Sequence, residues 1–321
     1  MCYIVKIIIK IFDIISCLIT PFIAFVSSVQ TRVGPERFPL TYMIWDIFHV
    51  SPIRHHYYQP VFNVRNLPER IWNRENQLPG IDFNIEGQLS LLRSFNYNSE
   101  LEVIPIEKPK EPLGFFHNNS FGVGDAEILY NMVRHFKTKK VIEIGSGFST
   151  RMMKKALDKN REEGFLSSHI CIEPYEMHWL ESLGIDKVIR SKVEDVDPIL
   201  FNELRENDIL FIDSSHVLRI GGDVFVEYLQ IIPNLRKGVL VHIHDIFLPN
   251  EYPRFWIMNK RRFWTEQYLL QAFLAFNSKF EVLLAVNYLA SYYSEEFSLK
   301  CPVYAKKLKR GTGSFWIRKI D

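Results

Sequence analysis

The sequence has few cysteines and almost no net charge. Its four cysteines, at positions 2, 17, 171 and 301 of 321 residues, are too far apart for a zinc or redox motif. This spacing argues against a disulfide framework and favours a reducing compartment. The 39 basic and 37 acidic residues leave a formal charge of +2. Because the basic residues form no stripe interleaved with aromatics, nucleic-acid binding is not predicted.

The most hydrophobic segment is N-terminal, and it has an ordered arrangement of polar residues. These recur every three or four positions, on one narrow stripe of a helix: Lys6, Lys10, Asp13, Ser16 and Thr20. Residues 14–31 carry no charge, which is borderline for a membrane span of about 20 residues. We expect residues 4–28 to contact a membrane surface as an interfacial helix. A short transmembrane anchor, a cleaved signal peptide and a soluble capping helix are the alternatives.

The rest of the chain divides into two regions that differ in their pattern of apolar residues. Residues 32–113 form an N-terminal annex, irregular apart from a short helix at 85–95, and a candidate substrate lid. From residue 114 to 321, apolar runs alternate with helical patterns. The expected strands are 140–144, 168–173, 187–190, 208–213, 238–245, 280–286 and 314–320, and the expected helices are 125–136, 149–159, 175–183, 197–204, 223–235 and 265–276.

This alternation predicts an α/β fold with a doubly wound, mostly parallel, seven-stranded sheet. The strands are continuous apolar runs, as burial on both faces requires. No helix is expected between the last two strands, so they should pair as an antiparallel C-terminal edge. The hydrophobic N-terminal helix and the irregular annex precede this domain.

A glycine turn follows the first of these strands, in the stretch EIGSGFST. Gly145 and Gly147 allow a ligand to approach the backbone closely, and their amides favour a carboxylate or phosphate. A nicotinamide dinucleotide would require a third glycine where Thr150 stands. S-adenosylmethionine carries a sulfonium cation instead, and Glu143, just before the glycines, suits such a ligand. Glu173, at the end of the second strand, can accept both ribose hydroxyls.

The stretches VIEIGSGFST, CIEP, DILFIDSSH and GVLVHIHDIF resemble the class I S-adenosylmethionine-dependent methyltransferases. They are most similar to a bacterial branch that includes sugar and small-molecule O-methyltransferases. The resemblance extends from Phe116 to the C-terminus and makes 114–321 a methyltransferase domain with a Rossmann-like fold. It implies that the cofactor is contacted by Glu143, Gly145, Ser146 and Gly147, the ribose by Glu173, and the adenine by Glu194.

Two further strands end in polar clusters that should open on the same crevice. They contain Asp213, His216, His244 and Asp245, the candidate catalytic residues. In some related enzymes, acids at the positions of Asp213 and Asp245 hold magnesium. His244 departs from that pattern and suits manganese, iron or zinc better than magnesium. Three interpretations remain open: a divalent cation at Asp213 and Asp245, a metal-free general base at His216 or His244, and a purely structural role.

Together these features predict a membrane-associated O-methyltransferase on the cytoplasmic side, or otherwise in the cytoplasm, acting on a sugar, glycolipid or small-molecule hydroxyl. Synthesis of S-adenosylmethionine in the cytosol argues against export. The insertion 246–264 contributes candidate acceptor contacts, unless it is a lid packed on the N-terminal region. These candidates are Tyr252, Arg254, Trp256 and the basic run Lys260 to Arg262. The alternatives in function are a nicotinamide-dependent oxidoreductase and a membrane-tethered cofactor-binding protein without transfer activity.

Overall fold

The computed structural model describes residues 3–73, 75–108, 114–115, 117, 120–175, 177–306 and 312–321. The chain divides into two compact units, Met1–Pro68 and Glu69–Asp321. The boundary predicted near residue 114 adjoins residues 109–113, which lie outside the described residues. The division at residues 31 and 113 therefore stays a prediction.

In the first unit, a single helix occupies most of the apolar N-terminus. Helix α1 (Tyr3–Val33) continues through Pro21 and is followed by η1 (Pro35–Arg37), α2 (Pro39–Ile47) and η2 (Val64–Asn66). Within α1 only Gln30 is buried. By length and composition alone, α1 is long and apolar enough to cross a membrane.

The second unit is built around a sheet that has seven strands in the described part of the chain. The strands are β1 (Lys140–Ile144), β2 (Ser168–Ile172), β3 (Lys187–Ile189), β4 (Ile209–Ile212), β5 (Leu240–Ile243), β6 (Phe280–Ala285) and β7 (Phe315–Lys319). Their order is β3-β2-β1-β4-β5-β7-β6. Strands β1 to β5 pair in parallel, whereas β7 is antiparallel to both β5 and β6. The predicted mostly parallel sheet with an antiparallel edge is confirmed. Strand β7 lies between β5 and β6, and β6 forms the edge of the sheet.

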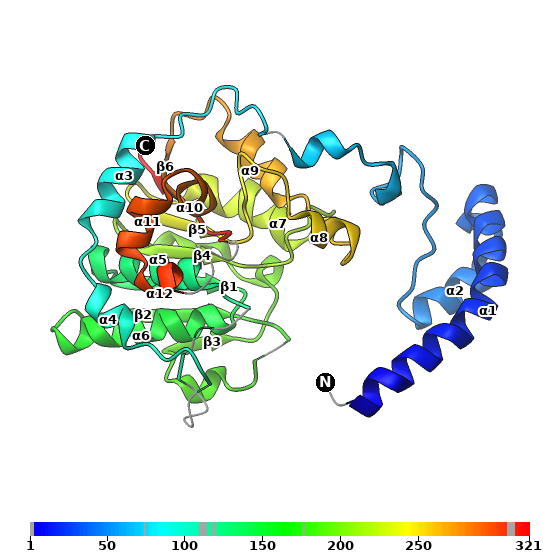
Figure 1. Ribbon diagram of the computed structural model, residues 1–321, viewed down its shortest axis with the longest axis horizontal. Helices are drawn as coiled ribbons and strands as arrows, with labels where there is room; N and C mark the ends of the chain where they lie inside the picture. The colour runs from blue at the N-terminus through cyan, green and yellow to red at the C-terminus, as the bar shows by residue number, and fades with distance from the viewer. Residues whose placement is uncertain are drawn as a thin grey trace. The chain divides into compact units, whose positions relative to one another are not determined.

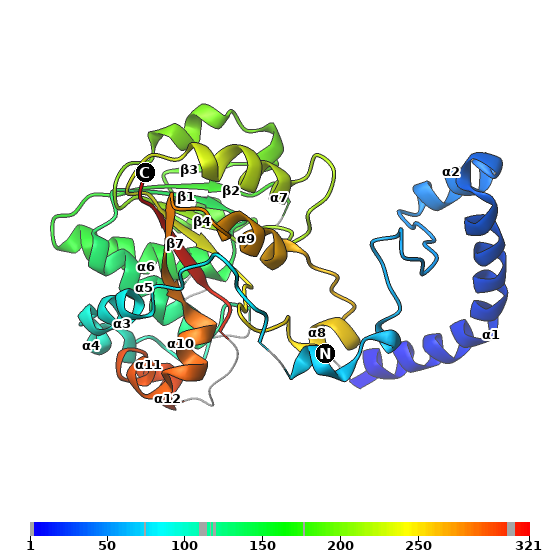
Figure 2. The ribbon, with the colours of Figure 1, turned by 90° about the horizontal axis from the view of Figure 1, so that it is seen from above.

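Helices cover both faces of this sheet. The α-helices of the second unit, in the described part of the chain, are α3 (Ile85–Ser94), α4 (Asn98–Glu102), α5 (Val123–Phe136), α6 (Phe148–Glu162), α7 (Asp223–Val226), α8 (Arg254–Met258), α9 (Glu266–Leu274), α10 (Val286–Tyr292), α11 (Ser294–Lys300) and α12 (Pro302–Lys306). Figures 1 and 2 show α5 and α6 on one side of the sheet and α7 on the other. Successive strand residues alternate between the two faces, so Val141 packs on the α5–α6 side and Ile142 on the opposite side.

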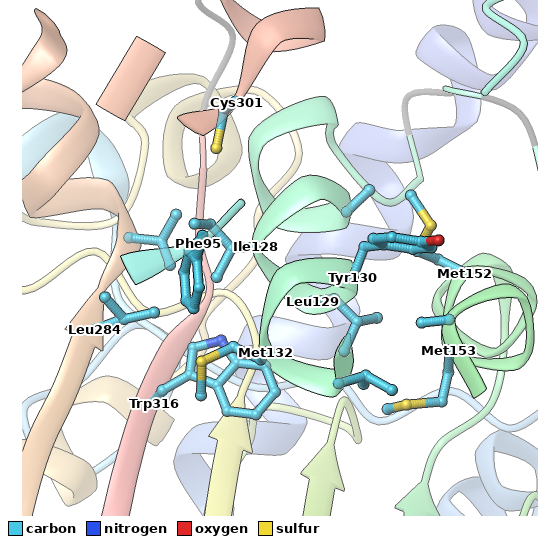
Figure 3. Packing of buried hydrophobic residues seen from close by; sticks show 14 of the residues in the cluster. Phe95, Ile128, Leu129, Tyr130, Met132, Met152, Met153, Leu284, Cys301 and Trp316 are labelled. Atoms are coloured by element: carbon cyan, nitrogen blue, oxygen red, sulfur yellow. The ribbon is translucent and has the colours of Figure 1, made fainter. Parts of the chain in front are cut away.

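The α5–α6 side holds the larger of the two apolar clusters. Figure 3 shows Leu129 and Tyr130 of α5 facing Met152 and Met153 of α6. The opposite edge of α5 packs against Phe95, Leu284 and Trp316, which come from the annex and from the last two strands. Long buried side chains therefore pack α5 against α6 on one side and against the last two strands on the other. This close packing keeps the layer of helices under the sheet rigid.

Three parts of the predicted secondary structure were wrong. Helices α10, α11 and α12 lie between β6 and β7, where none was expected, because each is only 5–7 residues long. The helices expected at 175–183 and 197–204 are short 3-10 turns, η4 (Leu180–Leu183) and η6 (Pro198–Glu203). The helix expected at 223–235 changes from α to π to 3-10 geometry along its length.

Candidate functional site

The turn after β1 lies beside the end of β4, at the point where the strand order reverses. Gly145 has φ +76°, and a Cβ added to it would lie 2.0 Å from the backbone oxygen of Asp213. Its amide donates to Ile172 O, on the other neighbouring strand, at 3.0 Å. Only glycine fits this conformation without displacing a backbone atom. The first glycine of the motif is therefore required by the packing of three strand ends.

The other amides of the turn donate to protein acceptors. Ser146 N donates to Glu173 Oε2 at 3.1 Å, and Gly147 N donates to Thr150 Oγ1 at 2.9 Å. Gly147 is extended, with φ −163°, and a Cβ there would meet only the end of Met177, at 4.0 Å. Both amides thus donate to side chains of the chain itself, and their predicted contact with an anionic group stays a prediction.

Glu143 supports the turn from the α6 side of the sheet. Its carboxylate is fully buried, and Oε1 accepts hydrogen bonds from the hydroxyls of Ser149 and Thr150, at 3.0 Å each. Its other oxygen lies 3.1 Å from His169 Nε2. The side chain thus faces the helix, and its predicted contact with a bound cofactor stays a prediction.

Glu143, His169 and Cys171 also bring three potential metal-ligand atoms within 4.8 Å of one another. The thiol of Cys171 donates to Glu143 Oε2 at 3.5 Å. Burial and the neighbouring Glu143 carboxylate raise the pKa of this thiol far above its usual value. The three side chains contact one another beneath the turn.

A cavity of about 270 Å³ opens where β1, β2 and β4 end. It is lined by Ile144, Gly145, Ile172, Glu173, Pro174, Tyr175, Lys192, Val193, Glu194, Asp213, Ser214, Ser215, Arg219 and Asp223. Of the predicted cofactor residues, Gly145, Glu173 and Glu194 line it, whereas Glu143, Ser146 and Gly147 do not. Glu173 accepts bonds from the amides of Ser146 and Tyr175, which holds its carboxylate at the wall.

A larger cavity, of about 580 Å³, runs along α6. Its lining includes Tyr130, Arg151, Lys154 and Asp158 but no residue from a strand end. Ligands of open parallel sheets bind beyond the carboxyl ends of the strands. The smaller cavity is therefore the candidate functional site.

Acidic and histidine side chains converge beside this cavity. His216 Nε2 lies 3.4 Å from Asp213 Oδ1 and 3.6 Å from Asp245 Oδ2. His244 Nε2 lies 3.6 Å from the other oxygen of Asp245. All four predicted catalytic side chains are thus neighbours. His242, by contrast, is fully buried, stacked on Phe211 and bonded to Ser314, as a structural histidine should be.

The comparisons with known proteins place this site in a family. Residues 142–246, from β1 to just beyond β5, match the family model described as a methyltransferase domain. An uncharacterized protein from Archaeoglobus fulgidus is 34% identical over 170 residues, which cover 48% of this chain and 74% of that relative. The chain belongs to the class I S-adenosylmethionine-dependent methyltransferase family. Methyltransferase domains of this kind use S-adenosylmethionine as their usual cofactor.

In this methyltransferase, burial and charge set the protonation of the cluster. Burial would raise the pKa of Asp213, but the nearby His244 and His216 lower it to about 2. Burial would lower the pKa of His216, but the carboxylates of Asp213 and Glu266 raise it well above its usual value. Burial also raises the pKa of Asp245. The cluster therefore favours a positive charge among its carboxylates.

The prediction missed one member of the methyltransferase cluster, Glu266. This fully buried residue begins α9, and its Oε2 lies 2.8 Å from His216 Nδ1. In the sequence Glu266 is only an acid at the start of a predicted helix, where acids are common. Its pairing with a histidine 50 positions earlier depends on the intervening loop, for which the sequence carries no periodic signal.

The insertion 246–264 contains both packed and half-exposed residues. The predicted acceptor contact Arg254 pairs with Glu69, with its Nη2 2.6 Å from Glu69 Oε1. The guanidinium of Arg262 lies 4.6 Å from the ring centre of Trp256 and 4.5 Å from that of Trp264. Trp264 in turn lies 4.3 Å from the ring of His216. Aromatic rings and a guanidinium therefore lie beside the cluster of acids and histidines.

Proposed function

We propose that this methyltransferase moves the methyl group of S-adenosylmethionine to a hydroxyl group of a sugar, a glycolipid or a related small molecule. The observation that carries the proposal is the juxtaposition of the cavity with the cluster of Asp213, His216, His244 and Asp245. S-adenosylmethionine supplies an electrophilic methyl group on a sulfonium. The protein has to align the acceptor and share its proton.

For the cofactor, we propose contacts with Gly145, Glu173 and Glu194, which line the cavity. Glu173 suits ribose hydroxyls because its carboxylate lies at the wall of the cavity and can accept hydrogen bonds from both. We propose that Glu143, Ser146 and Gly147 act on the cofactor indirectly, because their hydrogen bonds hold the turn after β1 in place. The same hydrogen bonds argue against a nicotinamide dinucleotide, because the amides that would bind its pyrophosphate donate to Glu173 and Thr150.

For the acceptor, we propose a hydroxyl activated at the cluster. An alcohol ionises too weakly to react unaided, so a histidine base or a divalent cation must assist it. The rings of Trp256 and Trp264 beside the cluster suit the apolar faces of a sugar, and Arg262 between them suits an anionic substituent. These residues favour a glycan-type acceptor over a wholly apolar one.

A methyl-label transfer screen tests this function. Full-length protein is incubated with methyl-labelled S-adenosylmethionine and cell extract, with and without a chelator. We expect label in a lipid-extractable glycan or small-molecule fraction, in a linkage resistant to mild base, as an ether is. Cofactor binding without label transfer to any fraction would instead indicate a binding protein. Consumption of a nicotinamide cofactor would indicate an oxidoreductase.

We further propose that α1 holds the enzyme on the cytoplasmic face of a membrane, lying in the interface. Nearly all of its apolar side chains are exposed, and the hydroxyl of Thr20 donates to Ser16 O within the helix, at 2.8 Å. An exposed apolar surface of this length requires a cover, and a bilayer interface covers it while Lys6 and Lys10 remain in water.

Vesicle sedimentation tests the membrane proposal. Substituting Ile15→Asp and Phe22→Asp together, opposite the polar stripe, should weaken binding to neutral phosphatidylcholine vesicles about 100-fold. The matched control Thr20→Asp, on the polar stripe, should bind as the unmodified chain does. Alkaline carbonate should release an interfacial helix. Retention of the charged double variant on vesicles would contradict the proposal.

A further inference from the structure

The first unit of the chain, Met1–Pro68, contains a cavity of its own. Its volume is about 490 Å³, and it is lined by residues from the end of α1, from α2 and from the segment 51–59 that follows α2. Its polar lining includes Thr31, Tyr42, Ser51, Arg54, His56 and Tyr58. The three acids of this unit, Asp13, Glu36 and Asp46, are not among the lining residues. A cavity lined by an arginine and hydroxyl groups but by no carboxylate suits an anionic ligand.

Local hydrogen bonds hold the turn that carries His56. The amide of Gln59 donates to His56 O at 2.9 Å, and the amide of Tyr58 donates to His56 Nδ1 at 3.3 Å. Because Nδ1 accepts this bond, the neutral ring carries its proton on Nε2 and keeps a donor for a ligand. Arg54, two residues earlier, supplies the planar fork of N–H donors that matches a phosphate group.

Helix α2 has an apolar stripe on the side opposite the cavity. Leu40, Met43, Ile44 and Ile47 recur at steps of three and four residues, and each side chain is more than half exposed. By the same spacing Tyr42, which lines the cavity, lies on the other side of α2. A helix in a bilayer interface buries such a stripe by roughly 5–10 Å. The other side of α2, with the cavity, would then lie at the level of the lipid headgroups.

Both the connection to α1 and the charge of the first unit favour a lipid surface as the partner of this stripe. Only residues 34–38 connect α2 to α1, whose apolar side chains are nearly all exposed. A surface that holds α1 therefore also lies within reach of α2. The first unit contains six lysines and arginines against three acids, and basic residues next to a membrane attract anionic lipids.

We propose that this cavity binds the phosphate group of an anionic phospholipid, with Arg54 as its main contact, and that α2 is a second interfacial helix. The inference rests on the proposed membrane placement of α1 and deepens it, because it adds a choice of lipid. A zwitterionic headgroup fits less well, since Arg54 would repel its ammonium group and none of the described lining residues is an acid that could pair with it.

Vesicle sedimentation of the full-length chain at constant ionic strength tests the choice of lipid. One set of vesicles is phosphatidylcholine, and the other also contains about 20% phosphatidylglycerol. We expect the unmodified chain to bind the anionic set about 10–30-fold more tightly. Arg54→Gln should lose about tenfold in affinity for the anionic set and stay within about twofold on the neutral set. Arg54→Lys, which keeps the charge without the planar fork, should still lose about threefold or more.

Matched variants separate the cavity and the stripe from general charge and exposure. Arg65→Gln makes the same charge change at an exposed residue of η2 that does not line the cavity, and it should lose less than about threefold. Ile44→Asp with Ile47→Asp should weaken binding to both sets of vesicles about tenfold. The control for this pair is Leu166→Asp with Ile199→Asp, at two exposed residues of the second unit, which should leave both affinities within about twofold.

The outcomes separate this inference from the proposed placement of α1. Equal affinity of the unmodified chain for the two sets of vesicles, or Arg54→Lys binding as tightly as the unmodified chain, would overturn the lipid site alone. Displacement from the anionic vesicles by inorganic phosphate would assign the cavity to free phosphate and overturn the lipid as its ligand. Unchanged binding of the Ile44 and Ile47 variant would overturn the role of α2. Failure of the unmodified chain to bind neutral vesicles would instead contradict the placement of α1.

Discussion

Asp213→Asn is expected to lower the rate of methyl transfer by about 10³-fold, the usual size of an effect on acceptor activation. The substitution keeps the size of the side chain and removes the negative charge that faces His216 at 3.4 Å. The backbone oxygen of residue 213, which packs on Gly145, is unchanged. Affinity for S-adenosylmethionine should therefore fall by less than about tenfold, since the cofactor site keeps its shape. Single-turnover kinetics and calorimetry on the same preparation measure the two quantities.

The control for this variant is Asp195→Asn, a charge change on an exposed residue at the end of the short 3-10 helix η5 (Val193–Asp195), next to the cavity-lining Glu194. Its transfer rate should match that of the unmodified enzyme. Melting temperatures of both variants establish that each is folded. A transfer rate in Asp213→Asn within threefold of the unmodified rate would leave the cluster with only a structural role.

Gly145→Ala is expected to cost the fold at least about 3 kcal/mol, because a left-handed alanine and a clash with a backbone oxygen add together. The added Cβ would lie 2.0 Å from Asp213 O, so the ends of β1 and β4 must separate. That displacement should also lower the transfer rate by about 100-fold, since small misplacements of catalytic groups have effects of this size. Urea unfolding measures the first effect, and label transfer measures the second.

Gly147→Ala provides the comparison two residues away. Its backbone is extended, and a Cβ there meets only Met177, at 4.0 Å, so the stability should change by less than about 1 kcal/mol. The two glycines look equivalent in the motif, but the structure gives them different roles. Similar losses of stability in both variants would refute this distinction.

The sequence predicted the sites that depend on strand ends. Glu173, Asp213 and Asp245 each follow a buried apolar run, and parallel strands bring their carboxyl ends to one edge. Their proximity therefore followed once the strands were recognised. The spacing of polar residues predicted the helix at α1. The short connection expected between the last two strands predicted the antiparallel pairing of β7.

The rest depends on contacts that no local pattern encodes. Glu266 reaches His216 only because the loop before α9 returns to the ends of the strands. In the sequence, Thr150 only marks the position where a dinucleotide-binding motif would have its third glycine. In the structure, its hydroxyl accepts a hydrogen bond from the Gly147 amide and donates one to Glu143. Both roles require the relative placement of a turn and a helix, which the period of apolar residues does not specify. Helices α10 to α12 were missed because 5–7 residues are too few to show a helical period.

The most direct test of the account is an isothermal titration of the unmodified full-length chain with S-adenosylmethionine, and of a second sample with a nicotinamide dinucleotide. We expect S-adenosylmethionine to bind at one site with a dissociation constant of about 1–100 μM, in the usual range for enzyme substrates. The dinucleotide should give no heat of binding, because the amides of the β1 turn already donate to Glu173 and Thr150. Absence of heat with S-adenosylmethionine, or tighter binding of the dinucleotide, would contradict the proposed site.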